Sequence, residues 1–357
     1  MFLRNHWYVA ASASEVGRSP LGRLILGEPV VFYRTEAGLC VGFEDRCAHR
    51  HLPLSMGKLV GDALQCRYHG LRFGPDGRCV RIPGQDKIPT GAKVKVYPIV
   101  ERYKWLWIWM GEPELADPAA ITDFHWLDDP NWGAKGSYLH VEANWQLIVD
   151  NLLDLTHLAF VHETTIGNAA LAEHATVKVT RSANNVVMTR WIIDQDPPPT
   201  FKKVGNFKGK VDRWQIIDFT PPAFLRLDVG ATPTGTGAPE GQRVGGINMR
   251  NLNAITPETE TTSHYFWAQA HDFDVNNAET TNKIFAEVER AFLEDVEVLS
   301  AQQHNLDLIP DRPQVDIGAD AGLIQARRVL SRMHEEEQAA IRSTAAVGRP
   351  EPMADYR

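Results

Sequence analysis

Cysteine is scarce in this sequence, with four residues among 357, and the chain has no long apolar run and no basic block. So few cysteines do not indicate a disulfide framework, which fits a reducing compartment. The net charge of −8 argues against a nucleic-acid-binding protein. The apolar run 105–110 is too short to span a bilayer, and the N-terminus lacks the continuous apolar core of a signal peptide. We therefore predict a soluble, cytoplasmic protein that binds neither membrane nor nucleic acid.

Two of the four cysteines lie in a short stretch that also carries histidines. Cys47 and His49 form a C-x-H pair, and Cys66 and His69 form a C-x-x-H pair further along. Two thiolates and two imidazoles on two loops indicate a metal site. Zinc would bind all four in a tetrahedron, whereas a 2Fe-2S cluster of the Rieske type would bind the thiolates on one iron and the imidazoles on the other. The loop-like residues after each pair favour the cluster, because a Cys2His2 zinc finger places its two histidines on a helix.

The remaining pattern predicts an α+β protein with an N-terminal all-β domain at 1–115. Strand-like runs separated by glycine-bearing turns support this domain, with the metal loops at one tip; the runs are 30–33, 40–43, 64–66, 94–99 and 105–110. Residues 116–342 form a second domain, in which an antiparallel sheet is accompanied by helices in a helix-grip-like arrangement. Its predicted strands are 176–180, 186–189, 211–219, 224–229, 246–252 and 262–270, and its predicted helices are 141–155, 277–304 and 320–342. We expect loops at 196–210 and 232–242 and a loose tail at 343–357.

The helix expected at 277–304 carries a carboxylate on its apolar face. Asp295 lies three residues after Phe292 and four before Leu299, whereas Glu294 should point to solvent. A carboxylate that faces a core requires a cation or hydrogen bonds. His157 and His162 are candidates, since two imidazoles and one carboxylate form the facial triad of non-haem Fe(II) oxygenases. Their five-residue spacing does not match one helix face, so the helix should loosen or end at 156–160. Taken without the upstream motif, the same three residues are better explained by ordinary structural roles in the core or at the surface.

Considered together, these segments resemble the Rieske non-haem iron oxygenases, in their catalytic α subunit, from about residue 4 to 305. The motif NLLDLTHLAFVH matches the family pattern of an Asp, then a His three residues later, then a His five residues after that; these are Asp154, His157 and His162. FLEDVEVLSAQQ supplies the matching Asp295. The segments DNLLDLTHLAFVH and SHYFWAQAHDF look most like the vanillate O-demethylase and dicamba demethylase branch.

The resemblance implies two cofactors and a set of partners. A Rieske 2Fe-2S cluster would be bound by Cys47, His49, Cys66 and His69, and a mononuclear Fe(II) by His157, His162 and Asp295. A separate NAD(P)H-dependent flavin/iron-sulfur reductase would supply electrons. In a head-to-tail homotrimer, Asp154 would connect His69 of one subunit to His157 of the next, because a carboxylate that accepts a hydrogen bond from a ligating imidazole orients it.

The resemblance also implies a reaction, the O-demethylation of a methoxylated, vanillate-like aromatic acid to a phenol and formaldehyde. The alternative is dioxygenation or methyl hydroxylation of a carboxylated or sulfonated arene, for example a phthalate, a chlorobenzoate or a toluenesulfonate. Asn248, Arg250 and His264 are polar residues on predicted strands that could hold a substrate carboxylate. Two non-enzymatic alternatives are an electron carrier with a ligand-binding sheet and a zinc-stabilised binding module.

Overall fold

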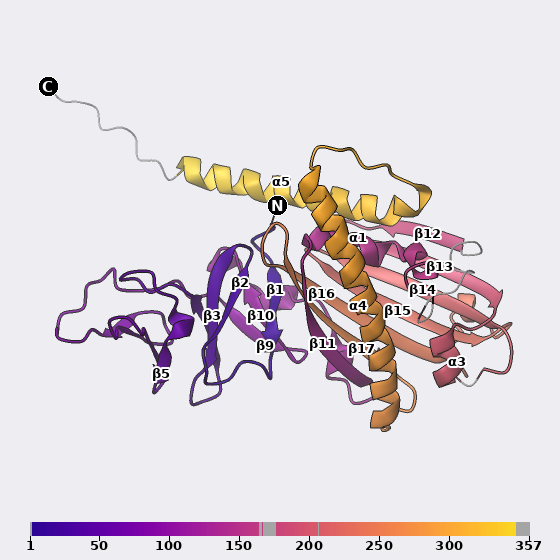
Figure 1. Ribbon diagram of the computed structural model, residues 1–357, viewed down its shortest axis with the longest axis horizontal. Coiled ribbons are helices and arrows are strands. Elements are labelled where there is room, and N and C mark those ends of the chain that lie inside the picture. The colour runs from indigo at the N-terminus through magenta and orange to yellow at the C-terminus, as the bar shows by residue number, and fades with distance from the viewer. Residues whose placement is uncertain (1, 164–165, 167–175, 206, 348–357) are drawn as a thin grey trace.

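The N-terminal part of the molecule consists of three small antiparallel sheets (Figure 1). The structure, a computed structural model, describes residues 2–163, 166, 176–205 and 207–347. The strands of these three sheets, in spatial order, are β1 (Trp7–Ser12), β10 (Trp105–Trp109) and β9 (Ile99–Arg102); β2 (Leu21–Ile25), β3 (Glu28–Arg34) and β4 (Cys40–Glu44); and β5 (Lys58–Val60), β6 (Ala63–Gln65), β7 (Arg72–Phe73) and β8 (Cys79–Arg81). The all-β architecture predicted for this region is confirmed.

The strand predicted at 94–99 is wrong. Val96 and Lys93 make only isolated bridges, to Phe43 and Arg78, and strand β9 begins at Ile99. Pro98 has no N–H to donate to a ladder, which restricts it to edges and irregular segments. The alternating apolar residues of this stretch therefore pack without forming a regular strand.

The C-terminal part is a seven-stranded antiparallel sheet with helices on one face. Its strands, in spatial order, are β11 (Gly133–Val141), β17 (Ser263–His271), β16 (Ile247–Pro257), β15 (Phe224–Pro233), β14 (Val211–Thr220), β13 (Val186–Gln195) and β12 (Thr176–Arg181). Consecutive strands pair with each other from β12 to β17, and β11 adds to the free edge of β17. The predicted α+β class is confirmed, although β11 was not predicted.

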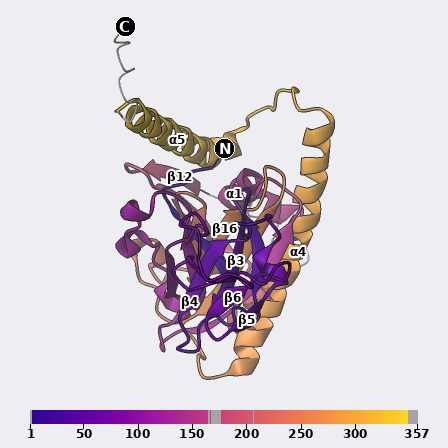
Figure 2. The same cartoon turned by 90° about the vertical axis from the view of Figure 1, so that its left-hand side faces the viewer.

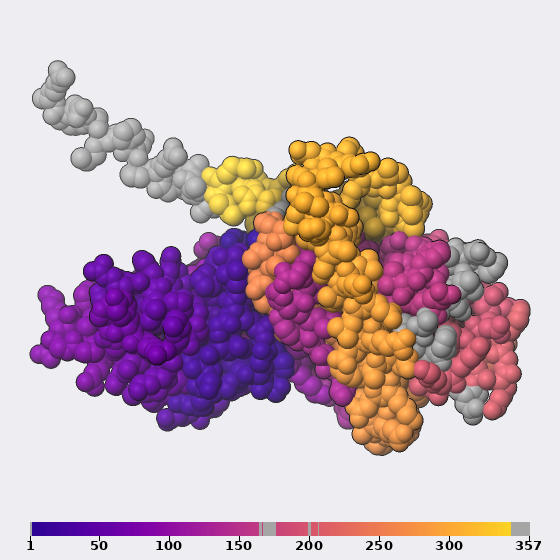
Figure 3. Space-filling view, viewed as in Figure 1, coloured from indigo at the N-terminus to yellow at the C-terminus, as the bar shows by residue number. Residues whose placement is uncertain are grey.

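One face of this large sheet is covered by two helices. Helix α1 (Trp145–Leu153) and helix α4 (Ala278–Leu308) bury Ile148, Leu152 and Phe292 against Tyr265 and Trp267 of β17. Figure 3 shows α4 running across the molecule on this side. Helix α5 (Ala321–Val347) contacts α1, β13 and β12. Figure 2 shows it lying above α1 and β12. We call this face the helix face of the sheet.

The opposite face packs against the N-terminal part of the protein, and we call it the N-domain face. Trp7, Trp107 and Trp109 from β1 and β10 contact Phe224 and Leu252 of the large sheet. The alternate residues of β10, Leu106 and Ile108, fill the N-terminal core instead. Strand β10 is therefore buried on both sides, which accounts for its unbroken apolar sequence.

Several predicted boundaries shift. Helix α1 begins at Trp145 rather than 141, because Asn144 caps it and residues up to Val141 belong to β11. The predicted loop 196–210 contains a short helix, α3 (Pro199–Gly205), which buries Phe201. Helix α5 includes 343–347, so the predicted loose tail cannot begin at Ser343, and 348–357 lie outside the described residues.

The remaining turns are short 3₁₀ helices: η1 (Leu54–Met56), η2 (Pro113–Leu115), η3 (Pro118–Ala120), η4 (His125–Leu127), η5 (Leu155–Ala159), η6 (Ala238–Glu240) and η7 (Gly318–Asp320). None of the helices in the described ranges is long and apolar enough to cross a membrane.

Candidate metal centres and the cavity between them and the sheet

Two loops with the same backbone pattern hold the N-terminal cysteines and histidines. In the first, the N–H of His51 donates to the Cys47 carbonyl (2.9 Å); in the second, the N–H of Gly70 donates to the Cys66 carbonyl (3.1 Å). Each cysteine N–H in turn donates to the carbonyl five residues later, that of Leu52 or Leu71. The fourth residue after each cysteine has positive φ, 60° at His51 and 72° at Gly70. The two loops are therefore structural equivalents, each presenting one thiol and one imidazole.

The four side chains converge with the thiols inside and the imidazoles outside. Cys47 and Cys66 are buried, whereas His49 and His69 are exposed, with ring centroids 4.6 Å apart. Burial, together with the neighbouring Cys66 thiol, raises the pKa of the Cys47 thiol to about 11. The Cys47 thiol would therefore stay protonated unless a metal displaced its proton. This donor set fits a 2Fe-2S cluster with one thiolate-bound iron and one imidazole-bound iron near the surface.

The second candidate centre joins residues that are far apart in the sequence. His162 Nε2 lies 3.1 Å from Asp295 Oδ1, and His157 Nε2 lies 3.5 Å from the same oxygen. One donor atom from each of the three residues lies within 4.8 Å of the others. His162 and Asp295 are buried, with exposed fractions of 1% and 6%. Two imidazoles and one carboxylate thus converge at a site that could hold a single metal ion.

The opposite ring nitrogens of both histidines are already bound. Nδ1 of His157 donates to the carbonyl oxygen of Asp154 (2.5 Å), and Nδ1 of His162 donates to Glu294 Oε2 (2.7 Å). A proton on each Nδ1 leaves the Nε2 lone pair free, and both Nε2 atoms face Asp295. This tautomer is the one that binds a metal through Nε2. Glu294, which we expected to point to solvent, is therefore a partner of His162.

The charges around the two histidines differ. Burial lowers the pKa of His157, with the Asp295 charge opposing it. For His162, burial also works against the charged form, but hydrogen bonds and charges from Asp295 and Glu294 outweigh it and raise the pKa. Two carboxylates next to buried imidazoles create a negative site, which a divalent cation would neutralise. The donor set therefore fits a ferrous ion.

The chain reaches this geometry because α1 ends just before the first histidine. The Asp154 carboxylate accepts hydrogen bonds from the N–H (2.8 Å) and hydroxyl (2.7 Å) of Thr156, which starts the 3₁₀ turn η5 that carries His157. The predicted break in the helix near 156–160 is confirmed. Asn151, in the last turn of α1, donates to Asp295 Oδ1 (3.0 Å) and was not predicted.

A cavity opens from the three candidate iron ligands toward the helix face of the sheet. Its walls are mainly apolar, with Leu152 and Leu158 on one side and Val288 and Phe292 of α4 on another. The sheet contributes alternate residues of β14 to β17, which the register places on one face; these are Arg213, Gln215, Leu227, Val229, Met249, Asn251 and Gln269. A metal site that faces a mostly apolar cavity with a few polar groups is typical of a substrate pocket.

Comparison with known proteins identifies the family. Residues 6–98 match the model of the Rieske 2Fe-2S domain, and residues 141–336 match the model of the vanillate O-demethylase oxygenase C-terminal domain. The chain belongs to the Rieske non-haem iron oxygenases. Its cofactors are those of that family, a Rieske 2Fe-2S cluster and a mononuclear non-haem iron.

Individual relatives of this oxygenase cover nearly its whole length. It is 48% identical to the toluene-4-sulfonate monooxygenase system iron-sulfur subunit TsaM1 of Comamonas testosteroni, over 94% of this chain and 98% of the relative. It is 38% identical to the vanillate O-demethylase oxygenase subunit of Pseudomonas sp. strain HR199, over 95% and 97%. The crystal structure of dicamba monooxygenase with non-heme iron and dicamba superposes with a TM-score of 0.78, at 30% identity over 95% and 99% of the two chains. The oxygenase is thus similar to the oxygenase components of monooxygenase systems.

The residues predicted to hold the substrate of this oxygenase do not line the cavity. Asn248 and His264 lie on the N-domain face of the sheet, as does Arg250. Asn248 Nδ2 donates to Asp272 (2.8 Å), and the imidazole of His264 lies between the Tyr138 hydroxyl (2.8 Å) and the Leu24 carbonyl (2.9 Å). All three residues have even numbers, whereas the residues of the same two strands that line the cavity, Met249, Asn251 and Gln269, have odd numbers. Because adjacent residues of a strand point to opposite faces, the three side chains lie on the face of the sheet away from the cavity.

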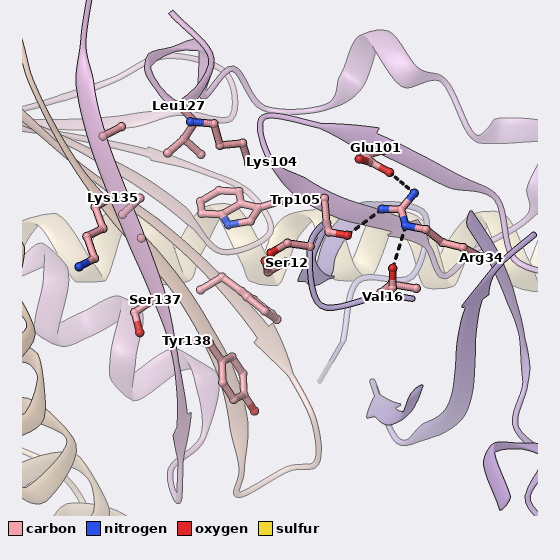
Figure 4. A pocket seen from close by; sticks show the side chains of 16 residues that line it. Ser12, Val16, Arg34, Glu101, Lys104, Trp105, Leu127, Lys135, Ser137 and Tyr138 are labelled. Carbon is pink, nitrogen blue, oxygen red and sulfur yellow. Dashed lines mark hydrogen bonds and ion pairs between the residues drawn. The ribbon is translucent and has the colours of Figure 1, made fainter. Parts of the chain in front are cut away.

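A second hollow in the oxygenase lies where the N-terminal domain meets β11 (Figure 4). Trp105 and Tyr138 form part of its wall. Its arginine, Arg34, is fully engaged: it pairs with Glu101 (2.8 Å) and donates to the Val16 carbonyl (2.7 Å). This hollow contains none of the candidate iron ligands, and the charge of its arginine is already balanced.

Proposed function

We propose that this oxygenase inserts one atom of O2 into a methyl or methoxy C–H bond of an anionic arene. The observation that carries the proposal is the buried donor set of His157, His162 and Asp295 opening on a mainly apolar cavity. When bound, the iron would supply O2 activation beside the substrate, and the cluster would supply electrons one at a time. Cys47, His49, Cys66 and His69 are the residues that we propose hold the cluster.

The surrounding residues would keep the ligands in place. Glu294 and the Asp154 carbonyl fix the imidazole tautomers, and such partners also raise ligand basicity. Asn151 holds one oxygen of Asp295. The apolar walls would exclude water and confine the aromatic ring, so that the reacting methyl group is held near the iron site. The protein thus contributes orientation and water exclusion.

Methyl hydroxylation of a toluenesulfonate-like arene is the first candidate reaction. It is supported by the 48% identity to a subunit of a toluene-4-sulfonate monooxygenase system. The O-demethylation of a vanillate-like acid is the second, supported by the match over 141–336 to the vanillate O-demethylase domain. The first reaction yields a benzylic alcohol, whereas the second yields a phenol and formaldehyde.

The oxygenase would work in a homotrimer with a separate reductase. Figure 1 shows β5, which lies between the two cluster loops in the sequence, in the N-terminal part of the molecule and apart from α1. Tyr68, next to His69, is 62% exposed, and Phe160, between the two iron histidines, is 75% exposed. Exposed aromatic residues are typical of surfaces that a partner covers. We propose that neighbouring subunits meet there, with Asp154 connecting the two centres. We expect the NAD(P)H-dependent flavin/iron-sulfur reductase, and therefore the oxygenase, to be cytoplasmic.

Product analysis tests this proposal. Purified, iron-loaded protein would receive O2, a surrogate reductase, and either toluene-4-sulfonate, 4-methylbenzoate, vanillate or a phthalate. A benzylic alcohol from the methyl compounds, or formaldehyde from vanillate, is the expected result. A cis-diol as the sole product would contradict monooxygenation, and an iron content of two per chain would favour an electron carrier, since the proposal requires three.

A further inference from the structure

Arg213 is a buried cation in the wall of the cavity that also contains the three candidate iron ligands. Its side chain projects from β14 onto the helix face of the sheet, and 5% of its surface is exposed. Its Nη2 donates to the Ile166 carbonyl at 3.4 Å, and its guanidinium lies 4.8 Å from the centre of the Phe201 ring. Nε and Nη1 have no hydrogen-bond partner among the described residues.

The charge of Arg213 is not balanced by any carboxylate in the described part of the chain. Burial, together with the nearby charge of Arg190, lowers its pKa to about 10. A pKa of about 10 still leaves the guanidinium protonated at neutral pH. Arg190 lies on the same face of the sheet, opposite Gln215 in the register, and its Nε and Nη1 also lack partners in the described ranges. The Asp154 charge opposes the effect of burial on the pKa of Arg190, whereas no carboxylate of the described residues acts on Arg213 in this way. Arg213 therefore requires an anion from elsewhere, because an unpaired buried charge is strongly unfavourable.

Two neutral side chains beside Arg213 are also incompletely bonded. Gln215 Oε1 and Asn251 Oδ1 have no partner among the residues that the structure describes, and both amides line the cavity. The oxygen and nitrogen of such an amide exchange places by a simple flip. Each amide can therefore present an N–H to an acceptor in the cavity. Asn251 Nδ2 donates to Gln269 Oε1 (3.2 Å), so the Gln269 amide flips together with that of Asn251. A guanidinium flanked by amides matches a planar or tetrahedral oxyanion, which accepts two hydrogen bonds from an arginine.

We propose that Arg213 binds the anionic group of the aromatic substrate, a carboxylate or a sulfonate, with Gln215 and Asn251 donating to its remaining oxygens. This assignment rests on the proposed function, since it concerns the same cavity. It makes Arg213 the residue that selects charged over uncharged arenes. The aromatic ring then lies between Arg213 and the iron site, against the apolar walls, so the anion would set the orientation of the ring.

Binding measurements on variants test the assignment. The iron-loaded parent protein, Arg213→Gln and Arg213→Lys would be titrated by equilibrium dialysis with toluene-4-sulfonate, 4-methylbenzoate, and their uncharged amides. We expect Arg213→Gln to raise Kd for the anions by about 100-fold, because it removes one partner of a buried charge pair. The uncharged amides should bind within about threefold of the parent protein, since they share the ring but lack the charge. Arg213→Lys should bind the anions more tightly than Arg213→Gln but less tightly than the parent protein, because lysine keeps the positive charge but lacks the two parallel N–H groups of a guanidinium.

Arg250→Gln is the matched control. Arg250 is a second arginine in the same sheet, but it faces the N-domain side and pairs with Asp228 (2.7 Å). Its replacement should leave the Kd of every probe unchanged. Iron content and the visible spectrum of the cluster would show whether each variant remains assembled.

The outcomes separate this assignment from the proposed function. Equal losses for anions and amides, an unchanged anion Kd in Arg213→Gln, or a parent protein that prefers the uncharged amides would each overturn the role of Arg213. If the parent protein binds the sulfonate more tightly than the carboxylate and Arg213→Gln loses this preference, the assignment is supported and the sulfonate is the preferred anion. If the parent protein instead binds the carboxylate more tightly and the variant loses that preference, the assignment is supported with the carboxylate as the preferred anion. If bound anions are not oxidised, the proposed reaction fails while the Kd differences still stand.

Discussion

The two faces of the seven-stranded sheet differ in the hydrogen-bond partners of their polar side chains. On the N-domain face, Asn248, Arg250 and His264 have side-chain or backbone partners. On the helix face, Arg213 and Gln215 retain polar atoms without a partner among the described residues. Native proteins satisfy almost all buried polar groups, and exceptions concentrate at functional sites. The arginine nitrogens of the sheet that lack a partner, those of Arg190 and Arg213, lie on the face next to the candidate iron ligands, whereas Thr232 Oγ1, which also lacks one among the described residues, is a neutral group on the other face.

The comparison of two carboxylates, one from each environment, should give the largest effect. Asp295→Ala removes an iron ligand, and we expect product formation to fall below detection, with iron dropping from three to two per chain and the cluster spectrum unchanged. Asp228→Ala, on the N-domain face, should keep three irons but lower the melting temperature, because it leaves Arg243 and Arg250 without their carboxylate. Metal analysis and thermal unfolding measure the two effects. Iron loss in Asp228→Ala would show that the two faces are not independent.

Replacement of Glu294 tests the partner of an iron ligand. Glu294→Ala removes the acceptor of His162 Nδ1–H, and we expect iron affinity to fall about 10- to 100-fold. Competition with a chelator measures the change. Glu297→Ala is the control, since Glu297 lies one turn away on the exposed side of α4. Equal iron affinity in the two variants would remove Glu294 from the site.

The stability of two arginine variants should change in opposite directions. Arg213→Met removes a buried cation that lacks a carboxylate in the described structure, and we expect a gain of about 1–2 kcal/mol in the free energy of unfolding. Arg250→Met breaks a pair with Asp228, which also binds Arg243, so a loss of about 1–2 kcal/mol is expected. Denaturant unfolding of the two variants measures the difference. A loss in both would show that Arg213 is balanced in the folded protein.

The smallest expected effect is at the end of α1. Thr156→Val removes one hydroxyl that donates to Asp154, and we expect a loss of about 0.5–1.5 kcal/mol in the free energy of unfolding. The Thr156 N–H still binds Asp154, so the iron content should not change. Thr261→Val, at an exposed position, is the control and should be neutral. A marked loss of iron in Thr156→Val would give this turn a larger role in placing His157.

Much of the fold was predictable because its local signals were clear. The alternating runs of β13 to β17 identified the strands, and the five-residue spacing of His157 and His162 indicated the end of α1. The prediction failed where local and tertiary preferences differ. Residues 94–99 alternate like a strand but include Pro98. Strand β11 contains Gly133 and Gly136, and glycine has a low strand propensity, so the sequence does not indicate this strand although its neighbours in the sheet stabilise it.

The candidate iron ligands were easier to identify from the sequence than the residues that line the cavity. Asp295 was identifiable because it interrupts the apolar stripe of a helix that has only one buried face. In β16 only residues 247–250 alternate, with Ile247 and Met249 buried and Asn248 and Arg250 half-buried, so only that part of the strand distinguishes its two faces. All residues from Asn251 to Ala254, and all nine of β17, are buried. A strand that is buried on both sides has no alternation to read.

The amino-acid order by itself was enough to propose the metal donors, because the candidate cluster ligands lie on two short loops and the two candidate iron histidines lie five residues apart. Tertiary structure alone decided which polar residues surround the substrate cavity. Strand pairing sets that choice, since adjacent residues of a strand point to opposite faces and only the packing of α1 and α4 on one face and the N-terminal sheets on the other distinguishes Arg213 from its neighbours.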